Sequence, residues 1–115
     1  MDKRTTVLIA DGAEEFSSAL SAALQHSDGF QVLATVNDGE QAIRQIMQLK
    51  PDILVLDLML SKQDGISVLK AISGMDKRPV TLATSGFITN FVASAASNLG
   101  VRYLMLKPCD TSALV

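Results

Sequence analysis

The sequence predicts an α/β fold with a doubly wound, five-stranded parallel sheet. The first observation behind this prediction is that short apolar runs alternate with segments of helical periodicity along the chain. Such repeated strand-helix units favour a parallel sheet with right-handed crossovers. The second observation is that the run from Ile53 to Leu56 is apolar without alternation. An uninterrupted run is typical of a central parallel strand that is covered on both faces.

The predicted elements are separated by glycine, proline and turn-forming pairs such as Asp-Gly. The predicted strands cover residues 6–10, 30–36, 53–57, 80–83 and 101–106. Helical spacing marks the segments that begin near Glu14, Gly39, Ile66 and Val92. A fifth helix has barely begun at residues 111–115, so the last helix is expected to be missing or truncated. We therefore expect residues 1–115 to be a single domain, C-terminally truncated from a longer protein.

Composition excludes several functional classes. The 115 residues are 48% hydrophobic and 19% charged, which suits one globular domain. Lys and Arg number 10 against 12 Asp and Glu, so no basic surface for nucleic acid is expected, and DNA would be contacted only by an absent output domain. Neither a signal peptide nor a membrane span fits, which favours a cytoplasmic location. The single cysteine, Cys109, is expected to be a packing or surface residue, and the side chain of Met59 is expected to be packed.

Four polar residues lie at the carboxyl ends of predicted strands: Asp11, Asp57, Thr84 and Lys107. Ligands of open parallel sheets bind at this edge, so the four side chains are expected to share one pocket. Phosphoryl transfer to a protein carboxylate needs a nucleophile, oxygen ligands for Mg²⁺, a hydroxyl and a cation. Asp57, Asp11, Thr84 and Lys107 supply these groups in that order.

The chain resembles the receiver domains of two-component response regulators, which have a flavodoxin-like fold. The residues that carry the resemblance are Val7 to Asp11, Pro51 to Leu60 leading to Asp64-Gly65, Ala83-Thr84 and Lys107-Pro108. Within this family the chain is most similar to the receivers of the sporulation master regulators of endospore-forming bacteria. That narrower likeness lies in the start of the chain, the segment around Asp57 and the run from Leu106 to Asp110.

The resemblance implies that Asp57 accepts a phosphoryl group from a histidine kinase or a phosphotransfer protein. Asp11, Asp57 and the backbone carbonyl of Met59 would hold Mg²⁺, while Thr84 and Lys107 would contact the phosphoryl group. The domain would catalyse at most its own aspartyl phosphorylation and dephosphorylation. A changed surface around the fourth helix and fifth strand would then switch an output domain, expected to act in transcription, with a homodimer formed on activation.

Two positions depart from the family pattern. Gly12 stands where the family has the second residue of an acidic pair, so one Mg²⁺ ligand is missing and weak Mg²⁺ binding is expected. Water or one of the acids Glu14 and Glu15 could take its place. Leu104 stands where the family commonly has an aromatic switch residue. The neighbouring Tyr103 lies on the opposite face of its strand, where a half-buried aromatic is expected.

Three alternatives follow from the same residues. A degenerate receiver, which binds partners independently of phosphorylation, is favoured by the two departures. An aspartyl-nucleophile phosphatase of the haloacid dehalogenase type would need a second Asp two residues after Asp57, where this chain has Met59. A dinucleotide-binding domain is disfavoured because no Gly-x-Gly-x-x-Gly follows the first strand.

Overall fold

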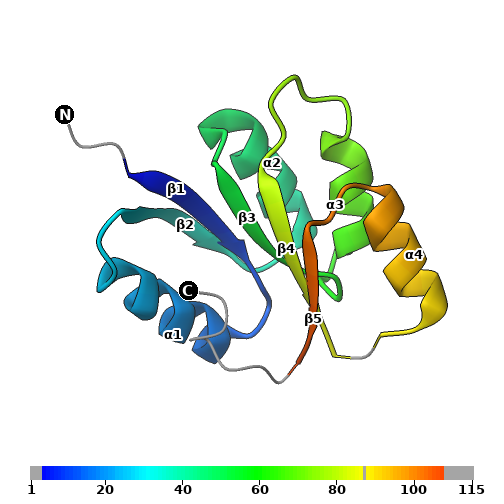
Figure 1. Ribbon diagram of the computed structural model, residues 1–115, viewed down its shortest axis with the longest axis horizontal. Helices are drawn as coiled ribbons and strands as arrows, with labels where there is room; N and C mark the ends of the chain where they lie inside the picture. Colours follow the sequence, from blue (N-terminus) through cyan, green and yellow to red (C-terminus); the bar gives the residue numbers. More distant parts are fainter. Residues whose placement is uncertain (1–3, 87, 108–115) are drawn as a thin grey trace.

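The computed structural model describes residues 4–86 and 88–107 of the chain, which form one parallel sheet with helices on both faces (Figure 1). The sheet has five strands in the order β2-β1-β3-β4-β5. The strands are β1 (Thr5–Ala10), β2 (Phe30–Val36), β3 (Ile53–Asp57), β4 (Val80–Ser85) and β5 (Tyr103–Leu106). All neighbouring strands pair in parallel. The predicted doubly wound five-stranded sheet is confirmed.

Four helices connect the strands: α1 (Glu14–Gln25), α2 (Gly39–Leu49), α3 (Gly65–Ile72) and α4 (Asn90–Asn98). Three of them begin at a side-chain cap, in which Asp38, Asp64 and Thr89 accept hydrogen bonds from backbone N–H groups. Each cap satisfies one of the amide groups that a helix start leaves without an internal partner. The caps therefore fix where the loops at the carboxyl edge of the sheet turn into helices.

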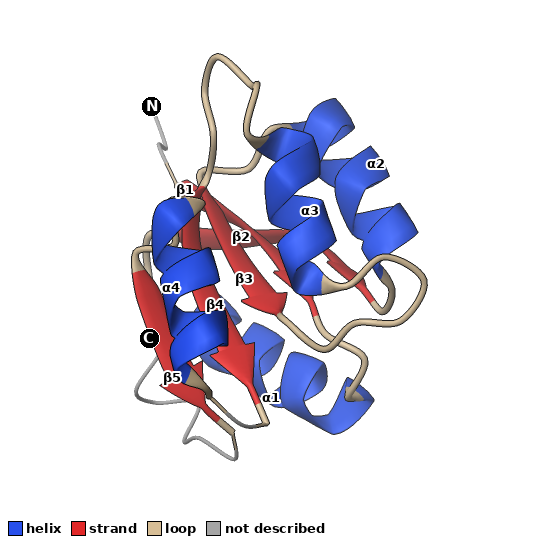
Figure 2. Ribbon diagram, turned by 90° about the vertical axis from the view of Figure 1, so that its right-hand side faces the viewer, coloured by secondary structure: helices blue, strands red, loops and turns tan. Residues whose placement is uncertain are grey.

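Two apolar layers hold the helices on the sheet. Helices α2, α3 and α4 cover one face, where their side chains pack on Leu8, Leu54, Leu56 and Ala83. Helix α1 covers the other face, where Leu20 and Leu24 join a second cluster of residues, which also contains Val7, Ile9 and Val55. Figure 2 shows the two layers on either side of the strands. The central strands are buried on both sides, as the uninterrupted apolar run in β3 predicts.

The boundaries of three strands differ from the prediction. Strand β1 begins at Thr5, one residue earlier than expected. Strand β4 continues through Thr84 and Ser85, because both residues pair with β5 and their carbonyl groups accept hydrogen bonds from Leu58 and Lys107. Strand β5 begins at Tyr103 rather than at residue 101. The expected truncated helix and Cys109 lie outside the described residues. In the part of the chain that the structure describes, no helix is long and apolar enough to cross a membrane.

Candidate functional site

Asp11 follows the buried strand β1 at the carboxyl edge of the sheet, and only 2% of its surface is exposed. Its Oδ1 atom accepts a hydrogen bond from the backbone N–H of Ala13 at 2.7 Å. Its Oδ2 atom lies 2.5 Å from Nζ of Lys107. A buried carboxylate needs such partners, because burial without them would disfavour the charged form. Both oxygens of Asp11 are thus held in defined directions.

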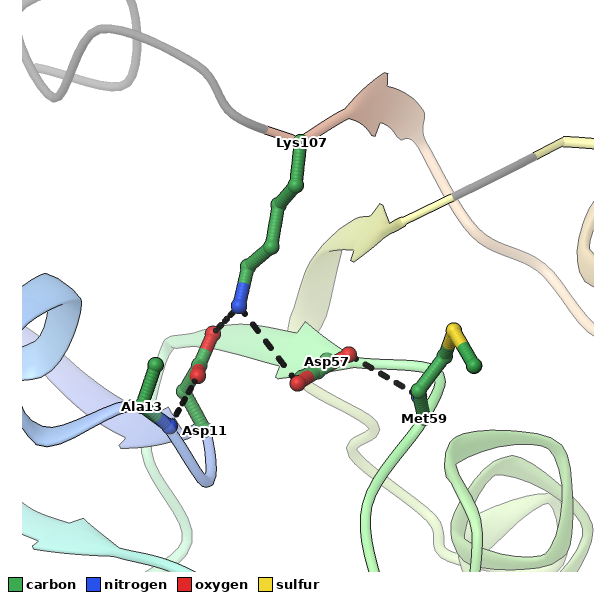
Figure 3. A network of polar contacts seen from close by, with 5 residues as sticks. All are labelled: Asp11, Ala13, Asp57, Met59 and Lys107. Carbon is green, nitrogen blue, oxygen red and sulfur yellow. Dashed lines mark hydrogen bonds and ion pairs between the residues drawn. The ribbon is translucent and has the colours of Figure 1, made fainter.

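Asp57 ends strand β3 next to Asp11 and is 9% exposed. Its Oδ1 atom accepts a hydrogen bond from the backbone N–H of Met59 at 2.9 Å. Its Oδ2 atom faces Nζ of Lys107 across 3.4 Å. One oxygen is therefore oriented by the backbone, while the other points toward the ammonium group in the middle of the site (Figure 3).

Lys107 joins the two carboxylates although it comes from the far end of the chain. It follows β5, and its backbone N–H donates to the carbonyl of Ser85 at 2.7 Å. Its side chain reaches across β4 to Asp11 and Asp57, and Nζ also lies 4.8 Å from the ring centroid of Phe16 on α1. A cation over an aromatic face is stabilised by about 0.5–2 kcal/mol, depending on its exposure to water. The ammonium is therefore positioned by two carboxylates and one ring.

Thr84 is the fourth of the predicted site residues. It lies on strand β4, where it is paired with Asp57 in the sheet register. The residue is fully buried, and its Oγ1 atom has no hydrogen-bond partner. Buried hydroxyl groups are ordinarily hydrogen-bonded, so an unpartnered hydroxyl needs an explanation. A hydroxyl beside Asp57 can donate to an oxygen of a group attached to that carboxylate.

Gly12 leaves space on the metal side of the site. A Cβ atom built on Gly12 would have only the carbonyl of Asn37 nearby, at 3.8 Å. A cavity of about 260 Å³ lies here, and polar residues dominate its lining, among them Asp11, Glu14, Ser17 and Asn37. The Oγ atom of Ser17 is buried without a hydrogen-bond partner. The space beside Gly12 is thus open and polar.

The donor set decides how well the site fits Mg²⁺. Carboxylate and carbonyl oxygens, such as those of Asp11, Asp57 and Met59, are hard donors, and Mg²⁺ is commonly held by one or two carboxylates together with water. No group of three or more His, Cys, Asp or Glu side chains that could hold a metal occurs among residues 4–86 and 88–107. The ligand types fit the ion, but the charge of the site is low, because Lys107 offsets one of the two carboxylates.

A further buried carboxylate, Asp38, lies between the end of β2 and the start of α2. It accepts a hydrogen bond from the backbone N–H of Gln41 at 2.9 Å, and Lys62 lies 3.8 Å away. The hydrogen bond from Gln41 is the main cause that lowers the pKa of Asp38, and the charge of Lys62 lowers it further. Asp38 is a helix cap and is not joined to Asp11 or Asp57.

The four central residues share one edge of the sheet, but two of their neighbours were not predicted from the sequence. These are Phe16 and Ser17, and only the helical spacing of α1 could have suggested that they face the strand ends. Two packing expectations were wrong. Tyr103 is 60% exposed rather than half-buried, and Met59 is 55% exposed rather than packed.

One protein family matches nearly the whole chain. The family of response regulator receiver domains matches residues 7–115. The chain belongs to this family. The receiver resemblance and the flavodoxin-like fold that the sequence predicted are thereby confirmed.

One relative is similar to nearly the whole chain. A protein-glutamate methylesterase/protein-glutamine glutaminase from Caldanaerobacter subterraneus subsp. tengcongensis is 30% identical over 118 residues, covering 99% of this chain and 31% of that protein. The chain thus spans about a third of the length of that relative.

Solved structures of receiver domains have the same fold. The receiver of a response regulator NarL from Mycobacterium tuberculosis superposes with a TM-score of 0.87 at 23% identity, covering 96% of this chain and 89% of that one. The complex of CheX and CheY with BeF3 and Mg from Borrelia burgdorferi gives a TM-score of 0.82 at 27% identity, covering 95% and 82%.

Proposed function

We propose that this receiver domain accepts a phosphoryl group on Asp57 from a histidine kinase or a phosphotransfer protein, and that the modification switches an output domain. The observation that carries this proposal is the contact of Lys107 with both Asp11 and Asp57, at 2.5 and 3.4 Å, beside the unpartnered hydroxyl of Thr84. The nucleophile Asp57, the cation Lys107 and the free hydroxyl of Thr84 thus lie together at the carboxyl edge of the sheet. Phosphoryl transfer to a carboxylate uses all three groups together.

In the proposed reaction, Oδ2 of Asp57 attacks the phosphorus of a phosphohistidine on the partner protein. The P–O bond to Asp57 forms as the P–N bond to histidine breaks, and the histidine nitrogen leaves with the bonding electron pair. Lys107 lies 3.4 Å from Oδ2 before transfer and can pair with a phosphoryl oxygen after it. Thr84 can donate its hydroxyl hydrogen to another phosphoryl oxygen.

Asp11, Asp57 and the Met59 carbonyl are the groups that would hold Mg²⁺ in this proposal. The ion supplies charge neutralisation for the phosphoryl oxygens when it is bound. Since Gly12 offers no carboxylate, we expect weak binding that depends on water for the remaining ligands. Before transfer, the ammonium of Lys107 shields Asp11 and Asp57 from each other.

The test is the intact mass of the protein after incubation with phosphoramidate and an excess of Mg²⁺. Wild type is expected to gain one phosphoryl mass, and Asp57→Asn is expected to gain none. Asp64→Asn is the matched control, because Asp64 is an exposed helix cap outside the site. No adduct on folded wild type at high Mg²⁺, or equal labelling of Asp57→Asn, would sink the proposal.

A second candidate is a degenerate receiver that binds its partner without phosphorylation. Gly12 favours it by weakening the metal side, and Leu104 favours it because a leucine packed on the core lacks the ring of the common switch residue. This candidate predicts that a partner binds wild type and Asp57→Asn with equal affinity. An affinity that rises on phosphorylation of Asp57 rules it out.

The resemblance to the sporulation regulators also leads to expectations about the output, the oligomeric state and the location of the protein. We propose that the output is transcriptional, as in the sporulation regulators that the sequence resembles, and that DNA is contacted only by a separate output domain. A homodimer formed on activation and a cytoplasmic location belong to the same proposal. Sedimentation of the protein with and without phosphoramidate tests the dimer.

A further inference from the structure

A second cavity lies at the opposite end of the sheet from Asp57. It has a volume of about 420 Å³ and is formed by the loop between α3 and β4, the start of β4, the end of α4 and the residue before β5. Figures 1 and 2 both show these segments together at the amino ends of the strands. Small-molecule sites have volumes of roughly 300–1,000 Å³. The cavity is large enough for a small ligand.

Charge distinguishes this cavity from the rest of the chain. Three cations line it, Lys77, Arg78 and Arg102, against one carboxylate, Asp76. The whole chain carries a net charge of −2, so a local excess of two positive charges stands out. The ammonium of Lys77 lies 3.5 Å from the carboxylate of Asp52, which is outside the cavity. This ion pair partly neutralises the charge of Lys77. The two guanidinium groups supply the remaining positive field.

Neither arginine is used in the fold through its charge. Arg78 and Arg102 are exposed, and neither side chain has an ion pair or a hydrogen bond within the described residues. The guanidinium of Arg78 lies against Gly100, where its Nη1 atom is 3.3 Å from the position that a Cβ atom on Gly100 would take. Gly100 has a φ of +89° after the end of α4, a left-handed backbone conformation that favours glycine. Because glycine has no side chain, the guanidinium can lie close to this turn.

Part of the cavity lining is apolar. Leu69 and Ile72 from α3 and Leu99 from the end of α4 line it beside Pro79 and Val80. Leu69 and Ile72 are buried core residues, so this surface is rigidly supported. A ligand would therefore meet two exposed planar cations together with buried hydrocarbon from Leu69 and Ile72.

We propose that this cavity binds a small organic anion, in which a phosphate or carboxylate group pairs with Arg78 and Arg102 and an apolar moiety contacts Leu69, Ile72 and Leu99. Guanidinium groups match phosphate and carboxylate oxygens in bidentate geometry. The residues that line this site are separate from Asp57 and its neighbours.

The test is a titration of the ¹⁵N-labelled chain with phenyl phosphate, followed by amide chemical shifts in the absence of Mg²⁺. The amides of Gly100 and Arg102 are expected to shift saturably, with a Kd on the order of 1 mM. Phenyl phosphate bound instead at Lys107 would shift the amides of Ala13 and Met59, and that result would overturn the proposal. Absence of a saturable shift up to about tenfold that concentration would also overturn it.

Variants and simpler probes separate the parts of the proposed site. Arg78→Gln and Arg102→Gln are each expected to raise the Kd at least about fivefold, whereas Arg44→Gln on α2 is the matched control and should not change it. Inorganic phosphate is expected to bind at least about fivefold more weakly than phenyl phosphate. Equal binding by the two phosphates, or unchanged binding by Arg78→Gln, contradicts the assignment.

Discussion

Restoring the missing acid should strengthen Mg²⁺ binding, and the structure allows the size of the effect to be worked out. Gly12→Asp places a carboxylate where a built Cβ has no neighbour closer than 3.8 Å, so the change introduces no clash. A unit charge about 4 Å from a divalent ion contributes about 2 kcal/mol at the dielectric constant of water and about 8 kcal/mol at an effective value near 20. Gly12 is exposed, so the lower value applies. It corresponds to about 30-fold tighter binding.

The assay is a Mg²⁺ titration of wild type and variant, followed by the amide resonances of Leu58 and Met59 or by calorimetry. Gly74→Asp is the matched control, because it adds the same charge where a Cβ has open space and lies beyond the end of α3, away from the site. A gain of less than about threefold for Gly12→Asp, or an equal gain for Gly74→Asp, would refute the argument that the missing carboxylate limits the metal side.

Three further predictions concern the scaffold and the ammonium. Gly39→Ala is expected to destabilise the fold by about 3 kcal/mol in urea unfolding, because the new Cβ would lie 1.7 Å from a backbone oxygen. Gly74→Ala is the control and should have little effect, since a Cβ there has open space. Equal stability of the two variants would contradict this prediction. Hydrogen bonds from a threonine and then a nearby lysine lower the pKa of Asp52, so its ionised form stabilises the fold above the usual aspartate pKa and this contribution is lost as the pH falls through the lowered value. Asp52→Asn should therefore reduce the free energy of unfolding at pH 7 but not in strong acid, and a loss independent of pH would argue against the charge. Phe16→Leu removes the ring beside the ammonium of Lys107 and should slow labelling by phosphoramidate about threefold or more. Phe30→Leu is the control and should not slow it. Equal labelling rates for the two variants would exclude a role of Phe16 in positioning the ammonium.

The fold could be predicted from the sequence because its signals are local. The apolar run of β3 and the cap residues Asp38 and Asp64 each mark an element without knowledge of the rest of the chain. The ends of the strands could not all be predicted in the same way. Strand β4 extends to Ser85 because pairing with β5 continues there, and a pairing between distant segments leaves no local signature.

The site could likewise be predicted from the sequence only in part. Asp11, Asp57 and Lys107 could be placed together because parallel strands bring their carboxyl ends to one edge. The ring of Phe16 beside Lys107 could not be predicted, because it depends on the rotation of α1 about its axis. Tyr103 shows a related limit: alternation along a strand gives the face of the sheet but not what covers that face.

Location of the phosphoryl group at the level of peptides tests the assignment of Asp57 most directly. Wild type is treated with phosphoramidate and Mg²⁺, reduced with borohydride, which converts an aspartyl phosphate into homoserine, and digested for mass spectrometry. Homoserine is expected at position 57 and at no other aspartate of the chain. Homoserine at another position, or none after complete reduction of folded protein, would contradict the role of Asp57 as the phosphoryl acceptor.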